Sequence, residues 1–93
     1  MAAYFIDLDG TIFKYDTNTP LPGAMEMLRG LKAGGHQLIF TTQRQEADSA
    51  KEALSREGIT GLFITSVESP RIVINDQGAY AVNHPTDSPW KKP

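Results

Sequence analysis

Two aspartates stand two positions apart in the run Asp7-Leu8-Asp9-Gly10-Thr11, directly after the apolar residues 4–6. Residues i and i+2 of a strand lie on the same side, so both carboxylates project together from a strand that ends near Gly10. Two adjacent negative charges repel each other unless a cation or a proton is shared between them. The pair is therefore predicted to be the centre of a metal-assisted reaction.

Two further polar clusters follow apolar runs. Thr41-Thr42-Gln43-Arg44 follows a run at residues 37–41, and Asn75-Asp76 follows a run at 71–75. Parallel sheets bind ligands beyond the carboxyl ends of their strands, so the three clusters are expected to converge.

The elements that must position these clusters can be read from the apolar pattern. Strands are predicted at residues 2–8, 37–41, 62–65 and 71–75, with a brief further strand at 78–83, and 2–8 is expected to be central. A helix that opens at Pro22 or Gly23 ends at Gly34-Gly35, and a second helix spans 45–57. Residues 11–22 form an irregular loop or small hairpin, and the tail 84–93 is irregular.

The order strand, helix, strand, helix, strand predicts an α/β fold with three Rossmann-like layers, in which helices flank a small, mainly parallel sheet. At 93 residues the chain is predicted to be a single domain, 1–93. One connection conflicts with this topology. Residues 66–70 reach only ~17 Å when extended, and a parallel crossover normally needs a dozen or more residues. Either 62–65 is a short or displaced strand, or one run is not parallel to the rest.

Composition excludes several classes of function. The net charge is -2 and the only basic cluster is Lys91-Lys92, which argues against general nucleic-acid binding. The absence of cysteine excludes disulfides, thiolate zinc sites and thiol nucleophiles. No signal peptide and no apolar run long enough to span a membrane is visible, so a cytoplasmic location is expected by default.

The three motifs resemble those of the haloacid dehalogenase (HAD) superfamily, whose members are mostly magnesium-dependent phosphatases. Residues 5–11 resemble its first motif, 39–44 its second and 72–76 its fourth, in the family's order. The resemblance implies a phosphomonoester hydrolase in which Asp7 is the nucleophile that forms an aspartyl-phosphate. It also implies that Asp9 is the general acid and base.

The same resemblance implies a Mg²⁺ site and a phosphate site. The metal would be held by the Asp7 carboxylate, the Asp9 carbonyl and the fourth motif, Asn75-Asp76. Thr42, with Thr41 as the runner-up, would hydrogen-bond the phosphoryl group. Gly10 would allow a sharp turn whose backbone amides face the phosphate.

Two departures from the family pattern bear on activity. Asn75 stands where an aspartate is common, which removes one charge from the metal site. The third-motif lysine is missing, and Ser69-Pro70-Arg71 stands in its place. Arg71 is a candidate replacement, but its position at the start of a predicted strand places it far from the site. Lys91, Lys92 or another chain are the other sources of a cation.

These departures leave three hypotheses. The first is a small, capless phosphatase, for which the absence of a cap predicts large phosphorylated substrates. The second is a degenerate domain that binds metal or a phosphorylated partner with little or no turnover. The third is a domain that is active only as an oligomer or within a larger assembly.

Simpler interpretations of the motifs remain. Asp9-Gly10 is compatible with a hairpin turn, and Asn75-Asp76 before Gln77-Gly78 with ordinary turn chemistry. An EF-hand loop fails, because its glycine belongs at loop position six, whereas Gly10 is fourth from Asp7.

Overall fold

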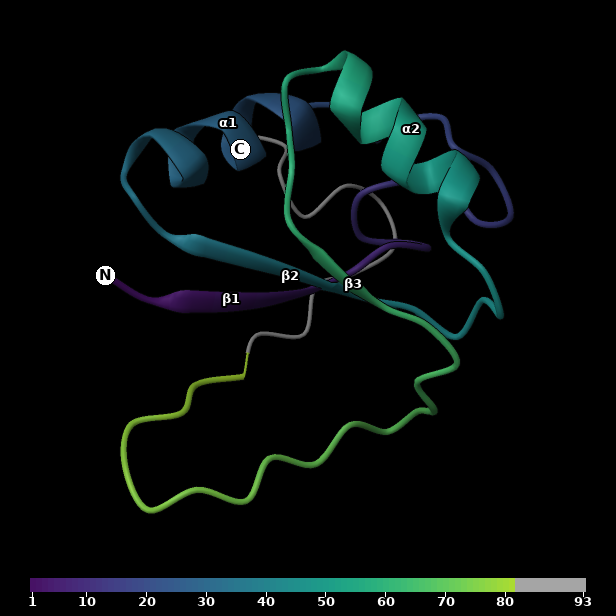
Figure 1. Ribbon diagram of the computed structural model, residues 1–93. Coiled ribbons are helices and arrows are strands. Elements are labelled where there is room, and N and C mark those ends of the chain that lie inside the picture. Colours follow the sequence, from purple (N-terminus) through teal and green to yellow (C-terminus); the bar gives the residue numbers. More distant parts are fainter. Residues whose placement is uncertain (82–93) are drawn as a thin grey trace.

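The computed structural model describes residues 1–81 and forms a small α/β unit around a parallel sheet (Figure 1). The three strands lie in the order β1 (Ala3–Asp7), β2 (Gln37–Thr41) and β3 (Leu62–Ile64), and both neighbouring pairs are parallel. Helices α1 (Ala24–Ala33) and α2 (Asp48–Arg56) connect them. The predicted α/β class and parallel sheet are confirmed.

Each helix buries part of its apolar side against the sheet. In α1, Met25 and Leu28 are buried, and the helix ends at Ala33, followed by the cap residue Gly34 and by Gly35, which turns the chain with a φ of 82°. Helix α2 begins three residues later than predicted and buries Ala50 and Leu54. The small Ala50 is fully buried, because its single methyl group lets the helix lie close to the sheet.

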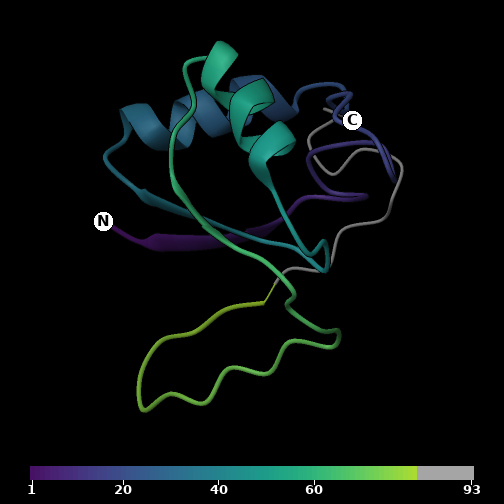
Figure 2. The same ribbon diagram turned by 45° about the vertical axis from the view of Figure 1, so that its right-hand side comes forward.

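Both helices cover the same face of the sheet in the two views (Figures 1 and 2). The core between these layers contains fully buried side chains from the strands, helices and loops: Leu8, Ile12, Phe13, Leu28, Leu38, Phe40, Leu54 and Ile59. On the opposite face, Phe5, Leu62 and Ile64 are exposed. The described residues therefore build two layers, and they place no helix on that second face.

The prediction that the first strand is central was wrong. Strand β1 lies at an edge of the three-stranded sheet, and β2 takes the central position between β1 and β3. The apolar run that suggested a strand buried on both faces instead has Ile6 buried and Phe5 67% exposed. A strand covered on only one face buries alternate residues, because successive side chains point to opposite sides.

The predicted strand at residues 71–75 was also wrong. This run has no regular secondary structure, and Ile72, Val73 and Ile74 are exposed. The short connection at 66–70 explains the difference, because it is too short to return the chain to the start of a parallel strand. Residues 66–81 instead loop away from the helices, on the other side of the sheet (Figure 1).

The remaining strand and tail predictions lie at the end of the chain. Residues 78–81 are not a strand. Residues 82–83 of that predicted strand, and the tail 84–93 with Lys91 and Lys92, lie outside the described residues. Within 1–81, no helix combines the length and apolarity that a membrane span requires.

Candidate active site

The turn after β1 presents the two aspartates. The Leu8 carbonyl accepts hydrogen bonds from the amides of Ile12 and Phe13 at 2.9 and 3.0 Å. Gly10 has a φ of 81°, a backbone conformation that favours glycine. Its amide donates to the Phe13 carbonyl at 2.8 Å. This amide is used within the turn, so Gly10 serves the bend itself, and the binding of phosphate by backbone amides of this turn stays a prediction.

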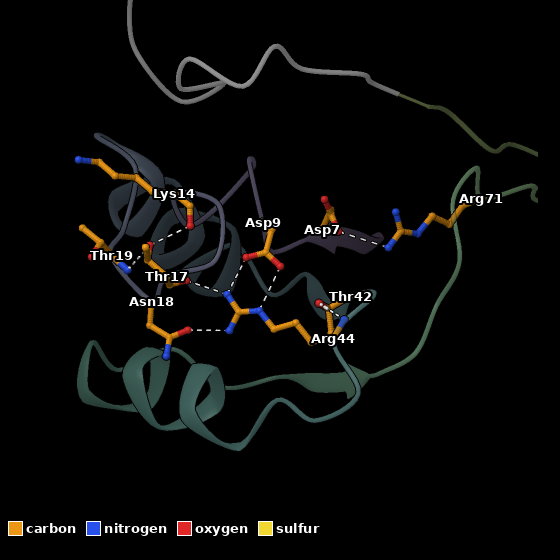
Figure 3. A network of polar contacts seen from close by, with 9 residues as sticks. All are labelled: Asp7, Asp9, Lys14, Thr17, Asn18, Thr19, Thr42, Arg44 and Arg71. Carbon is orange, nitrogen blue, oxygen red and sulfur yellow. Dashed lines mark hydrogen bonds and ion pairs between the residues drawn. The ribbon is translucent and has the colours of Figure 1, made fainter.

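The Asp9 carboxylate is held by Arg44, which follows β2. Arg44 Nη2 donates to Asp9 Oδ1 at 2.7 Å, and Nε donates to Oδ2 at 3.1 Å (Figure 3). Both side chains are only 21% exposed, so the pair is partly shielded from water. The hydrogen bond to Asp9 raises the pKa of the Arg44 guanidinium, which therefore stays charged.

The Asp7 carboxylate has a different cation. Arg71 Nη2 donates to Asp7 Oδ1 at 3.3 Å, and the two side chains are 32% and 38% exposed. Burial raises the pKa of the Asp7 carboxyl, and the Asp9 charge adds to this, while Arg71, the Leu8 amide and Arg44 act in the opposite direction. The net effect is a raised pKa.

Both carboxylates open into one pocket of about 440 Å³. The other side chains that line it come from the loop 11–22, the end of β2 and the segment after β3: Tyr15, Asp16, Gln43, Arg44, Ser69 and Arg71. The structure thus brings together Asp7 and Asp9, as the sequence predicted, and surrounds them with two arginines. Whether these residues are catalytic stays a prediction.

The two threonines after β2 have different environments. Thr41 pairs with Asp7 across the two strands, so both side chains lie on one face of the sheet. Thr42 is fully buried, and its hydroxyl oxygen accepts the Arg44 amide at 3.1 Å. Neither threonine lines the pocket, so the register places Thr41 beside the candidate nucleophile, while Thr42 supports the turn that carries Arg44.

Asn75 and Asp76 do not line this pocket. The Asn75 side-chain amide donates to the Gln77 carbonyl, which is the local turn contact that the simpler interpretation expected. Among residues 1–81, no group of three or more histidine or acidic residues is gathered for a metal. The role of Asn75 and Asp76 as metal ligands stays a prediction.

Sequence reasoning placed Arg71 far from the site, and this was wrong. A parallel strand at 71–75 would have placed Arg71 at its start, at the end of the sheet opposite to the carboxyl ends of the strands. Since that strand does not form, the loop after β3 keeps Arg71 beside the tip of β1. The short connection at 66–70 was the signal that could have revealed this, because it holds Arg71 near the carboxyl ends of the strands.

Comparison with known proteins identifies the family of the chain. Residues 4–91 match the family of haloacid dehalogenase-like hydrolases. A solved structure, the crystal structure of a hypothetical protein from Pyrococcus horikoshii OT3, is similar over 70% of this chain, with 28% identity and a TM-score of 0.56. The matched part is 26% of that protein's chain, so the present chain spans about a quarter of its length. No curated protein shows significant similarity.

Proposed function

This chain belongs to the haloacid dehalogenase-like hydrolases, and we propose that it is a magnesium-dependent phosphatase that works through an aspartyl-phosphate on Asp7. One observation carries the proposal: two aspartates share a pocket, but each is held by a different arginine. Two carboxylates in different environments can take different roles in one reaction.

The proposed reaction has two displacements. In the first, an Asp7 carboxylate oxygen attacks phosphorus, the bond to the ester oxygen breaks, and Asp9 gives a proton to that leaving oxygen. In the second, water attacks the phosphorus of the aspartyl-phosphate, and Asp9 takes the proton from this water. The bond between phosphorus and Asp7 then breaks, which releases phosphate and restores both carboxyl groups.

The donor set supports a Mg²⁺ site with few protein ligands. The Asp7 carboxylate and the Asp9 carbonyl would hold the ion, because magnesium is commonly bound by one or two carboxylates, substrate phosphate and several waters. Bound there, it would offset the repulsion between the Asp7 carboxylate and the phosphate. Residues 1–81 gather no third acidic ligand, so the site is expected to be weak without substrate.

Arg71 supports the proposal as the replacement for the missing third-motif lysine. Its guanidinium contacts Asp7 at 3.3 Å and lines the pocket, and both side chains remain partly exposed. An arginine in this position can meet an incoming phosphate with a planar pair of donors. It would offset the charge that builds up when a phosphate lies next to Asp7.

The substrate is proposed to be a phosphorylated molecule of considerable size. Within the described residues, only residues 8–23 separate β1 from α1, and their loop 11–22 contributes Tyr15 and Asp16 to one wall of the pocket. No cap covers the pocket in this part of the chain. The uncovered pocket therefore supports the proposal of a large phosphoester.

A phosphatase screen tests the proposed function. Purified protein is assayed for phosphate release from phosphometabolites, phosphopeptides, polynucleotides and an aryl phosphate, with Mg²⁺ and with chelator. We expect release that requires Mg²⁺ and is lost in Asp7→Asn, while the surface control Arg29→Met keeps the wild-type rate. Full turnover in Asp7→Asn would sink the aspartyl-phosphate mechanism.

A second candidate function is a degenerate domain that binds a metal or a phosphorylated partner without turnover. The observation that favours it is the absence of a third acidic ligand in residues 1–81, together with the position of Asn75 and Asp76 outside the pocket. Beryllofluoride mimics a phosphoryl group on aspartate. Its Mg²⁺-dependent binding to wild type and not to Asp7→Asn, combined with no turnover on any substrate, would support this candidate over the first.

A further inference from the structure

Arg44 connects three parts of the chain that are far apart in sequence. Its own backbone lies after β2, its side chain holds Asp9 after β1, and the same guanidinium reaches the loop 11–22. Nη1 donates to Asn18 Oδ1 and Nη2 donates to the Thr17 carbonyl, each at 2.7 Å (Figure 3).

The backbone of Arg44 is fixed as well. Its amide donates to the Thr42 hydroxyl oxygen at 3.1 Å, and its carbonyl accepts the Ser66 amide at 2.8 Å. The guanidinium also lies over the ring of the fully buried Phe13, at 5.9 Å from its centre. These contacts hold the backbone and the guanidinium of Arg44 in place beside Asp9.

The hydrogen bonds of Arg44 leave little of its guanidinium for a ligand. All three of its nitrogen atoms donate to acceptors within this chain, namely Asp9, Thr17 and Asn18. The paired contact with both Asp9 oxygens also fixes the plane of the carboxylate, since the fork of an arginine matches it in two places. Arg71 differs, because its contacts with Asp7 and the Val67 carbonyl are longer, at 3.3 and 3.5 Å.

We propose that Arg44 is a positioning residue, which orients the Asp9 carboxylate for proton transfer and fastens the loop 11–22 beside it. This inference rests on the proposed function for the role of Asp9, whereas the fastening of the loop does not depend on any activity. Arg44 acts through Asp9 on the leaving group and does not itself bind the phosphoryl group.

Leaving-group dependence distinguishes this role from phosphate binding. Phenyl phosphate releases a basic oxygen that needs a proton, whereas 2,4-dinitrophenyl phosphate releases an oxygen that needs almost none. In Arg44→Met, we expect kcat/KM to fall about 10- to 100-fold for phenyl phosphate and less than about threefold for the dinitrophenyl ester, because only the first uses the acid. Arg44→Lys keeps the charge but lacks the paired N–H donors of the guanidinium. Its kcat/KM for phenyl phosphate should therefore lie between those of Arg44→Met and wild type.

The matched control is Arg56→Met, which removes an exposed ion pair with Glu52 on α2. It should leave both substrates unaffected. An equal loss of kcat/KM for the two esters in Arg44→Met would overturn the proposal. It would mean that Arg44 binds the phosphoryl group or only maintains the fold.

Limited proteolysis tests the loop independently of turnover. Trypsin can cut after Lys14, which lies in the loop that Arg44 fastens through Thr17 and Asn18. In Arg44→Met we expect cutting after Lys14 to become several-fold faster than in wild type, while cutting after Lys51 in α2 keeps its rate. The second site separates local opening from global unfolding.

The two measurements fail in different ways. If wild type hydrolyses neither ester and no substrate of the phosphatase screen, the proposed function fails and the acid-positioning part of the inference fails with it, but proteolysis still decides the fastening. If cutting after Lys14 is unchanged in Arg44→Met, or rises equally at Lys51, the fastening is contradicted even where the enzyme is active.

Discussion

Asp7 lies in an environment that opposes its charge. Burial raises the pKa of its carboxyl, and Arg71 offsets only part of this effect. A nucleophile must be ionised to attack phosphorus, so the folded chain carries an ionised group that its surroundings disfavour. Such a group should reduce stability while it serves the reaction.

Asp7→Asn is therefore expected to raise the melting temperature at neutral pH while it abolishes turnover. The pKa of the Asp7 carboxyl is higher in the folded than in the unfolded chain. Ionisation of Asp7 therefore lowers the stability of the fold as the pH rises from the unfolded-state pKa to the folded-state pKa. In acid, Asp7 is protonated in both states and the difference should vanish. Thermal unfolding of wild type and Asp7→Asn from pH 3 to 8 measures this difference. The expectation is contradicted if Asp7→Asn loses melting temperature relative to wild type on going from acid to pH 7.

Arg71, the cation next to Asp7, is expected to have a large effect on activity. Its loss in Arg71→Met removes a cation that lowers the pKa of Asp7 and that faces the phosphate, so kcat/KM should fall by about 10²-fold. The acid limb of the pH–rate profile should also move to higher pH. Arg71→Lys should keep part of the rate. The control Arg29→Met breaks a surface pair with Glu57, and an equal effect in both variants would exclude a specific role.

At the scale of elements, the turn after β1 depends on Gly10. Its φ of 81° is unfavourable for other residues, and a Cβ there would lie 2.7 Å from the ring of Tyr15. The turn therefore determines both the direction of Asp9 and the position of an aromatic wall of the pocket.

Gly10→Ala is expected to destabilise the fold by about 1–3 kcal/mol, because it adds backbone strain and displaces Tyr15. Gly30 is the matched control. It lies in α1 and a Cβ there meets nothing within 4 Å, so Gly30→Ala should stabilise by about 0.5–1 kcal/mol. Urea unfolding gives the free energy of unfolding of both variants. If Gly10→Ala and Gly30→Ala change it in the same direction, the turn at Gly10 is not strained.

Because the two faces of the sheet differ in burial, substitutions on them are expected to differ in their cost to the stability of the fold. Phe40 in β2 is fully buried under the helices and stacks on Phe63, with ring centres 4.8 Å apart. Phe40→Ala should cost about 3–5 kcal/mol. Phe5→Ala on the other face should cost less than about 1 kcal/mol, because Phe5 is 67% exposed. Similar losses in urea unfolding would mean that Phe5 is covered in solution.

At the scale of the whole molecule, apolar surface is concentrated on the side away from the helices. Phe5, Leu62 and Ile64 of the sheet are exposed there, and Ile72, Val73 and Ile74 are exposed on the segment that loops out on this side (Figure 2). Parallel sheets are usually covered on both faces. The described residues thus cover one face with helices, while on the other face Ile39 of the central strand is buried and Phe5, Leu62 and Ile64 stay exposed.

Amide hydrogen exchange should follow this division. Exchange is expected to be slowest in β2, which is paired on both edges, and fast at residues 71–76, which have no regular structure. If Asp76 is a metal ligand, Mg²⁺ with beryllofluoride should slow exchange at 71–76. Unchanged rates there, under conditions where both ligands bind, would exclude Asp76 from the metal site.

The sequence by itself determined the α/β class, the two helices, the positions of the first three strands and the pairing of Asp7 with Asp9 on one turn. These features depend on local spacing: apolar residues three and four apart indicate a helix face, and carboxylates two apart share a side of a strand. They could be read without knowing which parts of the chain meet.

Only the tertiary structure decided which strand is central, where residues 71–75 go and which cation faces each aspartate. Arg44 lies 35 positions after Asp9 and Arg71 lies 64 positions after Asp7. The apolar run at 71–75 had the composition of a strand, but strand formation depends on a partner edge and on a connection long enough to reach it. Contacts of this kind depend on the path of the whole chain, and for that reason the charges around Asp7 and Asp9 could not be read from their motif.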